Sequence, residues 1–117
     1  GGTIIQFNNH QGTNQQWQAV NVGGGFVELV NVNSGLALDV PNASTSQGVQ
    51  LDQWTYHSGT NQQWQLVSAG NGYDTIVNRN SGMLVDVSGQ STADLAPVIQ
   101  WPSNGGANQQ WQLVPVS

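Results

Sequence analysis

Apolar and polar residues alternate along most of the chain, in short runs that end at turn-forming residues. Such runs occupy residues 26–32, 36–40, 49–51 and 64–67, where Val, Leu, Phe and Trp recur at every second position or in brief blocks. A period of two is typical of β-strands with one buried face. Gly, Asn, Ser and Pro separate the runs, as at residues 33–35, and these residues favour turns. Because no stretch has a 3.6-residue apolar period, the pattern predicts an all-β protein without α-helices.

The same residues recur at a fixed interval. The pentapeptide Asn-Gln-Gln-Trp-Gln occurs at residues 14–18, 61–65 and 108–112, at intervals of 47 residues. A fixed interval of this length indicates one supersecondary unit that is copied and packed against its siblings. We therefore interpret residues 1–117 as a single domain, with a partial repeat at residues 1–25 and complete repeats at residues 26–72 and 73–117.

Three units of about four short strands restrict the possible architectures. A propeller needs at least four blades, whereas three such units around a pseudo-threefold axis make a β-trefoil, a six-stranded barrel capped by hairpins. The fold class that we expect is therefore an all-β β-trefoil. Each pentapeptide places its tryptophan in the same strand pattern, and we expect all three in the shared core: Trp17, Trp64 and Trp111.

The first repeat matches only the second half of the unit. Gln6-Phe7 aligns with Gln53-Trp54, and no residues align with the half that precedes it. The sequence therefore predicts an open barrel with an unpaired strand edge, which is prone to association. We expect either that a second copy of the chain or a complementing segment fills this gap, or that the chain is truncated or redesigned.

The amino-acid composition restricts the classes of ligand that the chain can bind. Charged residues make up 6% of the chain, against about 25% in typical globular domains, and the formal charge is −5 with one basic residue, Arg79. Such a chain cannot neutralise several phosphates, so nucleic acids and anionic lipids are excluded. No apolar run approaches the roughly 20 residues of a membrane span, and the absence of cysteine removes disulfides and thiolate metal sites. We expect no cofactor and no metal, and an uncharged, hydroxyl-rich ligand.

The repeated motifs resemble a known family. Asp-Val at residues 39–40 and 86–87, a Ser/Thr-rich loop, an aromatic residue and then Asn-Gln-Gln-Trp follow one another in this order. Over its whole length the chain is similar to the ricin B-chain-like, or R-type, lectin domains with Gln-x-Trp repeats. It is most similar to the xylan- and galactose-binding modules of bacterial glycoside hydrolases. The resemblance implies a secreted, non-catalytic carbohydrate-binding β-trefoil.

The resemblance also implies one shallow site in each complete repeat. In the family an aspartate accepts hydrogen bonds from sugar hydroxyls, an aromatic ring stacks on the pyranose, and nearby polar side chains add hydrogen bonds. The corresponding residues are Asp39, Trp54, His57, Asn61 and Gln62 in the second repeat, and Asp86, Trp101, Asn104, Asn108 and Gln109 in the third. The partial repeat keeps Phe7, His10, Asn14 and Gln15 but no aspartate, so we expect a weak or inactive site there.

Each of these residue types also has a structural interpretation, which the sequence leaves open. The site tryptophans could pack under a loop, the aspartates could cap turns and the asparagines could bond loop backbone. Gln53 and Gln100 directly precede the tryptophans, whereas many family members have a glutamine two residues before. The strand period of two places them on the opposite face, so we leave them out of the sites. His10 and His57 have no further ligand at metal spacing.

Other function classes fit less well. Asp39 and Asp86, the acid pair that the repeats suggest, would lie in separate lobes, farther apart than the roughly 5 to 9.5 Å that glycoside hydrolysis requires. We therefore expect no enzyme, and a binding partner that is a galactose- or xylose-type sugar, an oligosaccharide or a polysaccharide. The alternatives are a β-trefoil protein-interaction or inhibitor module, or a designed or truncated scaffold with little affinity for sugar.

Overall fold

The computed structural model describes residues 3–9, 14–32, 34–70, 72–87 and 98–115. This part of the chain consists of β-strands and short 3-10 turns, and it contains no helix long and apolar enough to cross a membrane. The strands are β1 (Thr3–Asn9), β2 (Asn14–Gly23), β3 (Phe26–Asn31), β4 (Ala37–Asp39), β5 (Asp52–Trp54), β6 (Trp64–Gly70), β7 (Tyr73–Asn78), β8 (Leu84–Val87), β9 (Val98–Trp101) and β10 (Trp111–Pro115). The turns are η1 (Pro41–Ala43), η2 (Thr60–Gln62) and η4 (Ala107–Gln109).

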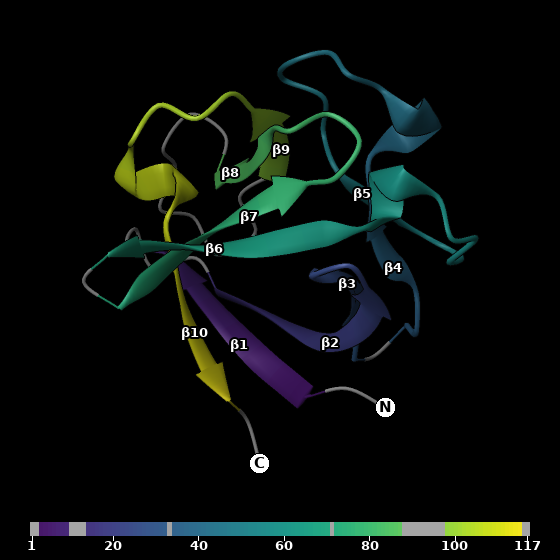
Figure 1. Cartoon of the computed structure of the whole chain (residues 1–117), viewed down its shortest axis with the longest axis horizontal. Coiled ribbons are helices and arrows are strands. Elements are labelled where there is room, and N and C mark those ends of the chain that lie inside the picture. The colour runs from purple at the N-terminus through teal and green to yellow at the C-terminus, as the bar shows by residue number, and fades with distance from the viewer. Residues whose placement is uncertain (1–2, 10–13, 33, 71, 88–97, 116–117) are drawn as a thin grey trace.

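Six of these strands close into an antiparallel barrel (Figure 1). β1 pairs with β2 and β10, β10 pairs with β7, β7 with β6, β6 with β3, and β3 with β2, so the ring returns to its start. The hairpin β4–β5 extends from β3, and the hairpin β8–β9 extends from β7. A six-stranded barrel with hairpin caps is the β-trefoil that the repeats predicted.

β1 lies in the barrel wall, where the sequence predicted an open edge. In the repeat alignment β1 corresponds to β5 and β9, which belong to hairpins. Here it pairs with β2 from Thr3 to Asn8 and with β10 from Ile5 to Asn9. These two ladders satisfy the backbone N–H and C=O groups along the edges of β2 and β10. The prediction of an open barrel is wrong, and with a closed ring no strand from a second chain or segment is needed.

The repeat tryptophans occupy the core, as predicted. They are 6%, 0% and 1% exposed and belong to one apolar cluster with residues of the barrel and of both hairpins: Trp17, Trp64 and Trp111. Three indoles of similar burial at equivalent positions follow from the copying of one unit around a common axis. The core is therefore formed jointly by all the repeats.

The buried indoles also fix the two hairpins. A buried indole N–H requires an acceptor. Trp64 Nε1 donates to Leu38 O at 3.1 Å, and Trp111 Nε1 donates to Val85 O at 3.3 Å. Each acceptor directly precedes the aspartate of its repeat. The core tryptophan of a repeat thus sets the position of the aspartate that the sequence assigns to the site.

The Asn-Ser-Gly turns before the hairpins hold the glutamines that precede the site tryptophans. Asn78 Oδ1 accepts the backbone N–H of Ser81 at 3.1 Å, and Ser81 Oγ donates to Gln100 Oε1 at 2.8 Å. The equivalent bond of the second repeat runs from Ser34 Oγ to Gln53 Oε1 at 2.6 Å. The two glutamines therefore bond to turns on the strand face opposite to the tryptophans, as the alternation of side chains indicated.

Candidate functional site

A pocket of about 510 Å³ opens in the second repeat, beside the hairpin β4–β5 and the turns η1 and η2. β4 contributes a buried aspartate, β5 contributes a second aspartate and an exposed tryptophan, and the segment after β5 contributes histidine and asparagine. Four of the five residues that the sequence assigned to this site line the pocket together. Its lining is Asp39, Pro41, Asn42, Ala43, Asp52, Trp54, His57 and Asn61.

Asp39 and Asn61 form the floor of the pocket. Asp39 is 4% exposed, and its Oδ1 accepts a hydrogen bond from Asn61 Nδ2 at 3.1 Å. The same carboxamide donates to Val40 O at 3.0 Å, and Val40 N donates to Asn61 O at 3.3 Å. Asn61 therefore bonds loop backbone, the structural role that the sequence left open, and it also orients the carboxylate.

Gln62 lies beneath the pocket and does not line it. It is 0% exposed, its Oε1 accepts the backbone N–H of His57 at 2.8 Å, and its Nε2 donates to Thr55 O at 3.0 Å. A buried carboxamide that uses both ends on one loop fixes the conformation of that loop. The position that the sequence assigned to sugar contact therefore holds His57 and the end of β5 in place.

Trp54 stands at the mouth of the same pocket. Its side chain is 60% exposed, the most exposed of the large hydrophobic residues in the described part of the chain. A tryptophan packed under a loop, the alternative open from the sequence, would be buried. An indole left in water beside a buried carboxylate provides the flat apolar surface and the polar group that a pyranose ring requires.

Asp52 is a pocket residue that the sequence analysis missed. It lies directly opposite Asp39 in the β4–β5 ladder, and the two carboxyls are within hydrogen-bonding reach. Burial, the hydrogen bond with Asp52 and the negative charge of Asp52 raise the pKa of Asp39 to about 6, against the opposing effects of Gln62 and His57. The available signal was the position of Asp52, two residues before Trp54 and on the same strand face.

The third repeat holds its aspartate differently. Asp86 is 3% exposed, with Oδ1 accepting from Asn108 Nδ2 and Oδ2 accepting from Gln109 Nε2, both at 2.8 Å. Burial raises the pKa of Asp86, and these two hydrogen bonds oppose the rise. The residue opposite Asp86 in the β8–β9 ladder is Ile99. The third repeat therefore brings together three of its predicted residues around one carboxylate and has no second carboxyl at the position of Asp52.

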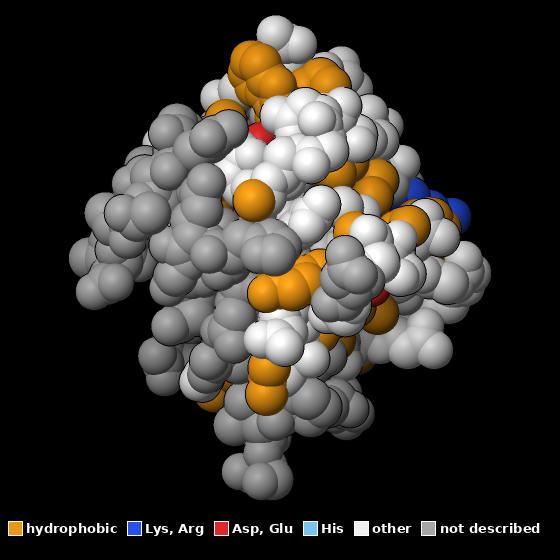
Figure 2. All heavy atoms as spheres, turned by 90° about the vertical axis from the view of Figure 1, so that its left-hand side faces the viewer, with side chains coloured by type: hydrophobic (Ala, Val, Ile, Leu, Met, Phe, Trp, Pro, Cys, Tyr) orange, Lys and Arg blue, Asp and Glu red, His pale blue; other side chains and the backbone are white. Residues whose placement is uncertain are grey.

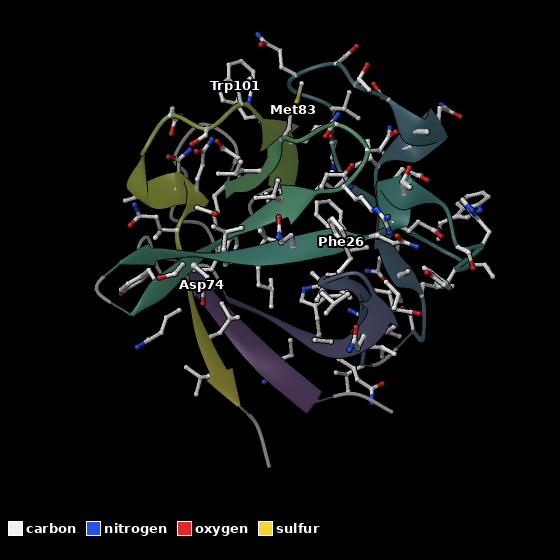
Figure 3. The ribbon with its side chains drawn as sticks, in the orientation of Figure 1. Phe26, Asp74, Met83 and Trp101 are labelled. Atoms are coloured by element: carbon white, nitrogen blue, oxygen red, sulfur yellow. The ribbon has the colours of Figure 1, made fainter. Side chains whose placement is uncertain are left out.

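Trp101 is more enclosed than Trp54. It is half-buried at the end of β9, and Figure 3 shows it at the edge of the molecule. A loop of the second repeat packs against it: a Cβ at Gly48 would lie 3.5 Å from Cζ3 of the indole. Gln100 Nε2 ties the same loop down by donating to Ser44 O at 3.0 Å and to Ser46 O at 2.9 Å. The two tryptophans are thus equivalent in the repeat alignment but not in exposure.

Asn104 belongs to a tight turn. Its Oδ1 accepts the backbone N–H of Gly106 at 2.7 Å, and its own N–H donates to Gln109 Oε1 at 3.0 Å. The side-chain oxygen of Asn104, a residue that the sequence assigned to sugar contact, therefore accepts a hydrogen bond within the turn. The loop of residues 88–97, which corresponds to one wall of the second-repeat pocket, lies outside the described residues.

Two glycines that the sequence analysis did not single out shape both sites. A Cβ at Gly59 would come within 2.4 Å of His57 Cε1 and 2.5 Å of Asn61 Oδ1. A Cβ at Gly106 would come within 2.5 Å of Asn108 Oδ1. Such distances are too short for any side chain, so only glycine allows the site asparagine to approach the loop this closely. The sequence feature that could have identified these glycines is their position, two residues before the site asparagine in both complete repeats.

Among the described residues, the partial repeat has no hairpin that corresponds to β4–β5. Phe7 lies in β1 and faces Gln15 in the β1–β2 ladder, and Asn14 faces Asn8 in the same ladder. His10 lies outside the described residues. Because β1 is a barrel strand here, the hairpin arrangement that brings Asp39 and Trp54 together has no counterpart around Phe7.

Solved structures similar to this chain include a designed protein and a galactanase. The designed threefold-symmetric protein ThreeFoil is 38% identical, with a TM-score of 0.91 over 97% of this chain and 99% of that one. The exo-β-1,3-galactanase 1,3Gal43A from Clostridium thermocellum is 36% identical, with a TM-score of 0.92 over 99% of this chain and 31% of the enzyme. The chain thus spans about a third of the galactanase.

More distant similarity concerns the fold. The Polyporus squamosus lectin is 16% identical, with a TM-score of 0.76 over 97% of this chain and 49% of the lectin. No curated protein sequence matches the chain. The family model for the ricin-type β-trefoil lectin domain-like family matches residues 13–101 and 75–117. The protein therefore belongs to the ricin-type β-trefoil lectin domain-like family.

Proposed function

We propose that the protein is a non-catalytic carbohydrate-binding module whose principal site is the pocket of the second repeat. One observation carries this proposal: the exposed indole of Trp54 and the buried carboxylate of Asp39 line one pocket. The indole offers its face to the CH groups of a pyranose, and the carboxylate accepts hydrogen bonds from neighbouring hydroxyls. A hydrogen bond to a charged acceptor contributes about 1.5 to 3 kcal/mol, against about 1 kcal/mol for a neutral one, so Asp39 supplies much of the affinity.

An uncharged ligand suits the surface of the molecule. Arg79, the one basic residue, is engaged within the fold: its guanidinium lies 4.3 Å from the centre of the Phe26 ring and donates to Gln63 Oε1 at 2.7 Å. Among the described residues on the face shown in Figure 2, charged side chains are few. The chain has no second Lys or Arg that could bind an anionic ligand beside the pocket.

A galactose-containing polysaccharide is the first substrate class to test. The galactanase from Clostridium thermocellum contains a region 36% identical to this chain, and a module that holds a β-1,3-galactan would keep such an enzyme near its polymer. Xylose-type sugars are the second class. Polymers of this kind lie outside cells, so we propose an extracellular site of action.

The third repeat is proposed as a second, weaker site. Asp86, Asn108 and Gln109 are in place, but Trp101 is partly covered by the loop of the second repeat. Shallow lectin sites bind monosaccharides weakly, and two linked sites on one polymer gain affinity through a high effective concentration. We therefore expect a larger gain from monosaccharide to polysaccharide than one site would give.

Binding without hydrolysis is the chemistry that these carboxyls support. Asp39 and Asp52 are within hydrogen-bonding reach, whereas the carboxyls of a glycosidase stand about 5 to 9.5 Å apart with the scissile bond between them. Asp39 and Asp86 lie in separate hairpins. We propose that neither pair can protonate a leaving group and attack the anomeric carbon together.

Isothermal titration calorimetry tests the proposal. Galactose, lactose, xylobiose, soluble β-1,3-galactan and xylan would be titrated into the protein and into Trp54→Ala, with Val67→Ala as a control for removing another exposed apolar side chain. We expect heat of binding for a galactose-type ligand that Val67→Ala retains. Trp54→Ala should weaken this binding at least about tenfold and leave only the weaker site of the third repeat. Absence of binding to every sugar, or full binding by Trp54→Ala, would overturn the proposal.

A further inference from the structure

The two complete repeats differ by one carboxyl in the ladder of the site hairpin. Asp39 faces Asp52 across β4 and β5, whereas the equivalent Asp86 faces Ile99 across β8 and β9. The difference lies in the pocket itself, because Asp52 is one of its lining residues. The copies that otherwise share their turns, glutamines and core tryptophans therefore present different chemistry to a ligand.

The carboxyls of Asp39 and Asp52 are arranged to share a proton. Asp52 Oδ1 is buried from solvent and has no hydrogen-bond partner. Asp39 accepts a hydrogen bond from Asn61 Nδ2 on its Oδ1, in a side chain that is 4% exposed. A proton on either carboxyl supplies the missing donor and removes the repulsion of two adjacent negative charges. The Asp86 carboxylate has donors on both of its oxygens and needs no such proton.

From this asymmetry we propose that Asp52 is a specificity-determining residue of the second-repeat site. Through a proton held between its carboxyl and that of Asp39, it makes the affinity of this site for a neutral sugar fall as the pH rises, while the third-repeat site, with Ile99, keeps its affinity. The inference rests on the proposed function, because it concerns sugar binding in the same pocket.

The direction of this pH dependence follows from the free-energy cost of removing water from the carboxyls when a sugar binds. A sugar seated against Trp54 removes water from the carboxyls beneath it, and removing water from two negative charges costs more than removing it from one. The shared proton also holds the two side chains together in the geometry that the ligand meets, whereas repulsion separates them. Both effects favour the singly ionised pair, so binding is tighter below the pH at which the pair loses its proton.

One other residue that lines the pocket, His57, could also make the sugar affinity depend on pH, and its contribution can be tested. The turns η1 and η2 contribute Pro, Asn, Ala, Thr and Gln to the surroundings, none of which titrates. His57 is the remaining titratable residue among those that line the pocket, and its positive charge acts to lower the pKa of Asp39. A variant without this histidine therefore belongs in the experiment.

Nuclear magnetic resonance can follow each site separately. Lactose would be titrated at pH 5.0, 6.0 and 7.5, and dissociation constants would be read from the indole N–H signals of Trp54 and Trp101. We expect the constant at Trp54 to rise about threefold to tenfold from pH 5.0 to 7.5, because one linked proton changes affinity by at most tenfold per pH unit, and the constant at Trp101 to stay level. The pH dependence at Trp54 should become much smaller in Asp52→Ile and Asp52→Asn, where burial alone still raises the pKa of Asp39, and it should persist in His57→Gln.

The reciprocal variant Ile99→Asp should transfer a pH dependence to Trp101. Lactose binding at Trp54 that is independent of pH in the parent protein would overturn the inference and leave the proposed function intact. Loss of the dependence in His57→Gln with its retention in Asp52→Asn would assign it to the histidine and overturn the inference as well. Absence of lactose shifts at both indoles at every pH would refute lactose binding and the inference together. The indole spectrum without sugar reports whether each variant is folded.

Discussion

Asn61 donates a hydrogen bond to Asp39 across 22 residues of sequence, at 3.1 Å and out of contact with solvent. The same bond recurs at 2.8 Å between Asn108 and Asp86. In both repeats the carboxamide belongs to a 3-10 turn and the carboxylate to a hairpin strand. The bond therefore joins the two halves of the site and couples its geometry to the stability of the fold.

Replacing Asn61 should disturb the geometry of the site and lower the stability of the fold. Asn61→Ala removes the donors to Asp39 Oδ1 and Val40 O, and we expect the free energy of unfolding to fall by about 1 to 3 kcal/mol, the cost of leaving buried groups without partners. Asn61→Asp keeps the shape but places a third acid beside Asp39, so it should be more destabilising at neutral pH than Asn61→Ala. Urea unfolding monitored by tryptophan fluorescence measures both. Equal stability of the parent and Asn61→Asp at pH 7 would contradict this assignment.

The two site tryptophans should respond differently to truncation. Trp54 is 60% exposed, so Trp54→Ala should change the free energy of unfolding by no more than about 0.5 kcal/mol while weakening sugar binding at least about tenfold. Trp101 packs against the loop at Gly48, so Trp101→Ala should cost about 1 to 2 kcal/mol of stability through lost apolar burial and weaken binding less. Calorimetry and urea unfolding of both variants make the comparison, and the opposite order of effects would show that exposure does not decide their roles.

Gly59→Ala should disrupt the second-repeat site through steric collision, without backbone strain. The backbone of Gly59 has φ −72, which alanine adopts without strain, but the added Cβ would collide with His57 and Asn61. We expect lower sugar affinity and a loss of about 1 to 3 kcal/mol of stability. Gly35→Ala is the matched control, because Gly35 has φ +73 and open space around its Cβ. It should cost about 1 kcal/mol through backbone strain and leave sugar affinity unchanged.

Mildly acidic solution should stabilise the protein. Asp39 has its pKa raised from 3.8 to about 6, and burial also raises the pKa values of Asp86 and Glu28. Each folded-state pKa lies above the unfolded value, so between about pH 4 and pH 6 the folded protein binds more protons than the unfolded chain. Its stability therefore decreases as the pH rises through this window. We expect a loss of about 1 to 3 kcal/mol from pH 4.5 to pH 7, since a tenfold difference in proton affinity between the two states corresponds to about 1.36 kcal/mol.

The variant Asp52→Asn checks the origin of this effect. It removes the neighbouring charge and provides a carboxamide donor, so the pKa of Asp39 should fall toward its ordinary value and the decrease in stability should become smaller. Thermal and urea unfolding at pH 4.5, 5.5 and 7 would follow both proteins. A parent protein that gains stability as the pH rises across this range would show that the buried carboxyls do not control it.

Regular features of the sequence were enough to predict most of the fold. Period-two alternation predicted the strands, and the 47-residue interval predicted the trefoil and the three buried tryptophans. The position of β1 was not predicted, because the alignment relates β1 to β5 and β9 by sequence, whereas strand pairing depends on which edges remain unpaired in space. Equivalence between repeats therefore identified the unit but not the role of its incomplete copy.

The lining of the second-repeat pocket was predicted only in part, for a similar reason. Asp39 and Trp54 are marked by their recurrence in both repeats, whereas Asp52 occurs in only one of them and a search for shared residues passes over it. The covering of Trp101 by the loop at Gly48 involves two different repeats and has no signature within either. Residues that make the repeats differ, and contacts between repeats, required the structure.

The pairing of β1 with β10 also has a consequence for attachment. Because the ladder is antiparallel and places Ile5 beside Pro115, the start of β1 and the end of β10 lie at the same end of the barrel (Figure 1). A fluorescent protein or a solid support could therefore be joined to either strand without interrupting β4 or β5, which contribute residues to the pocket. Immobilised through this end, the domain should remain open to long chains that are anchored elsewhere.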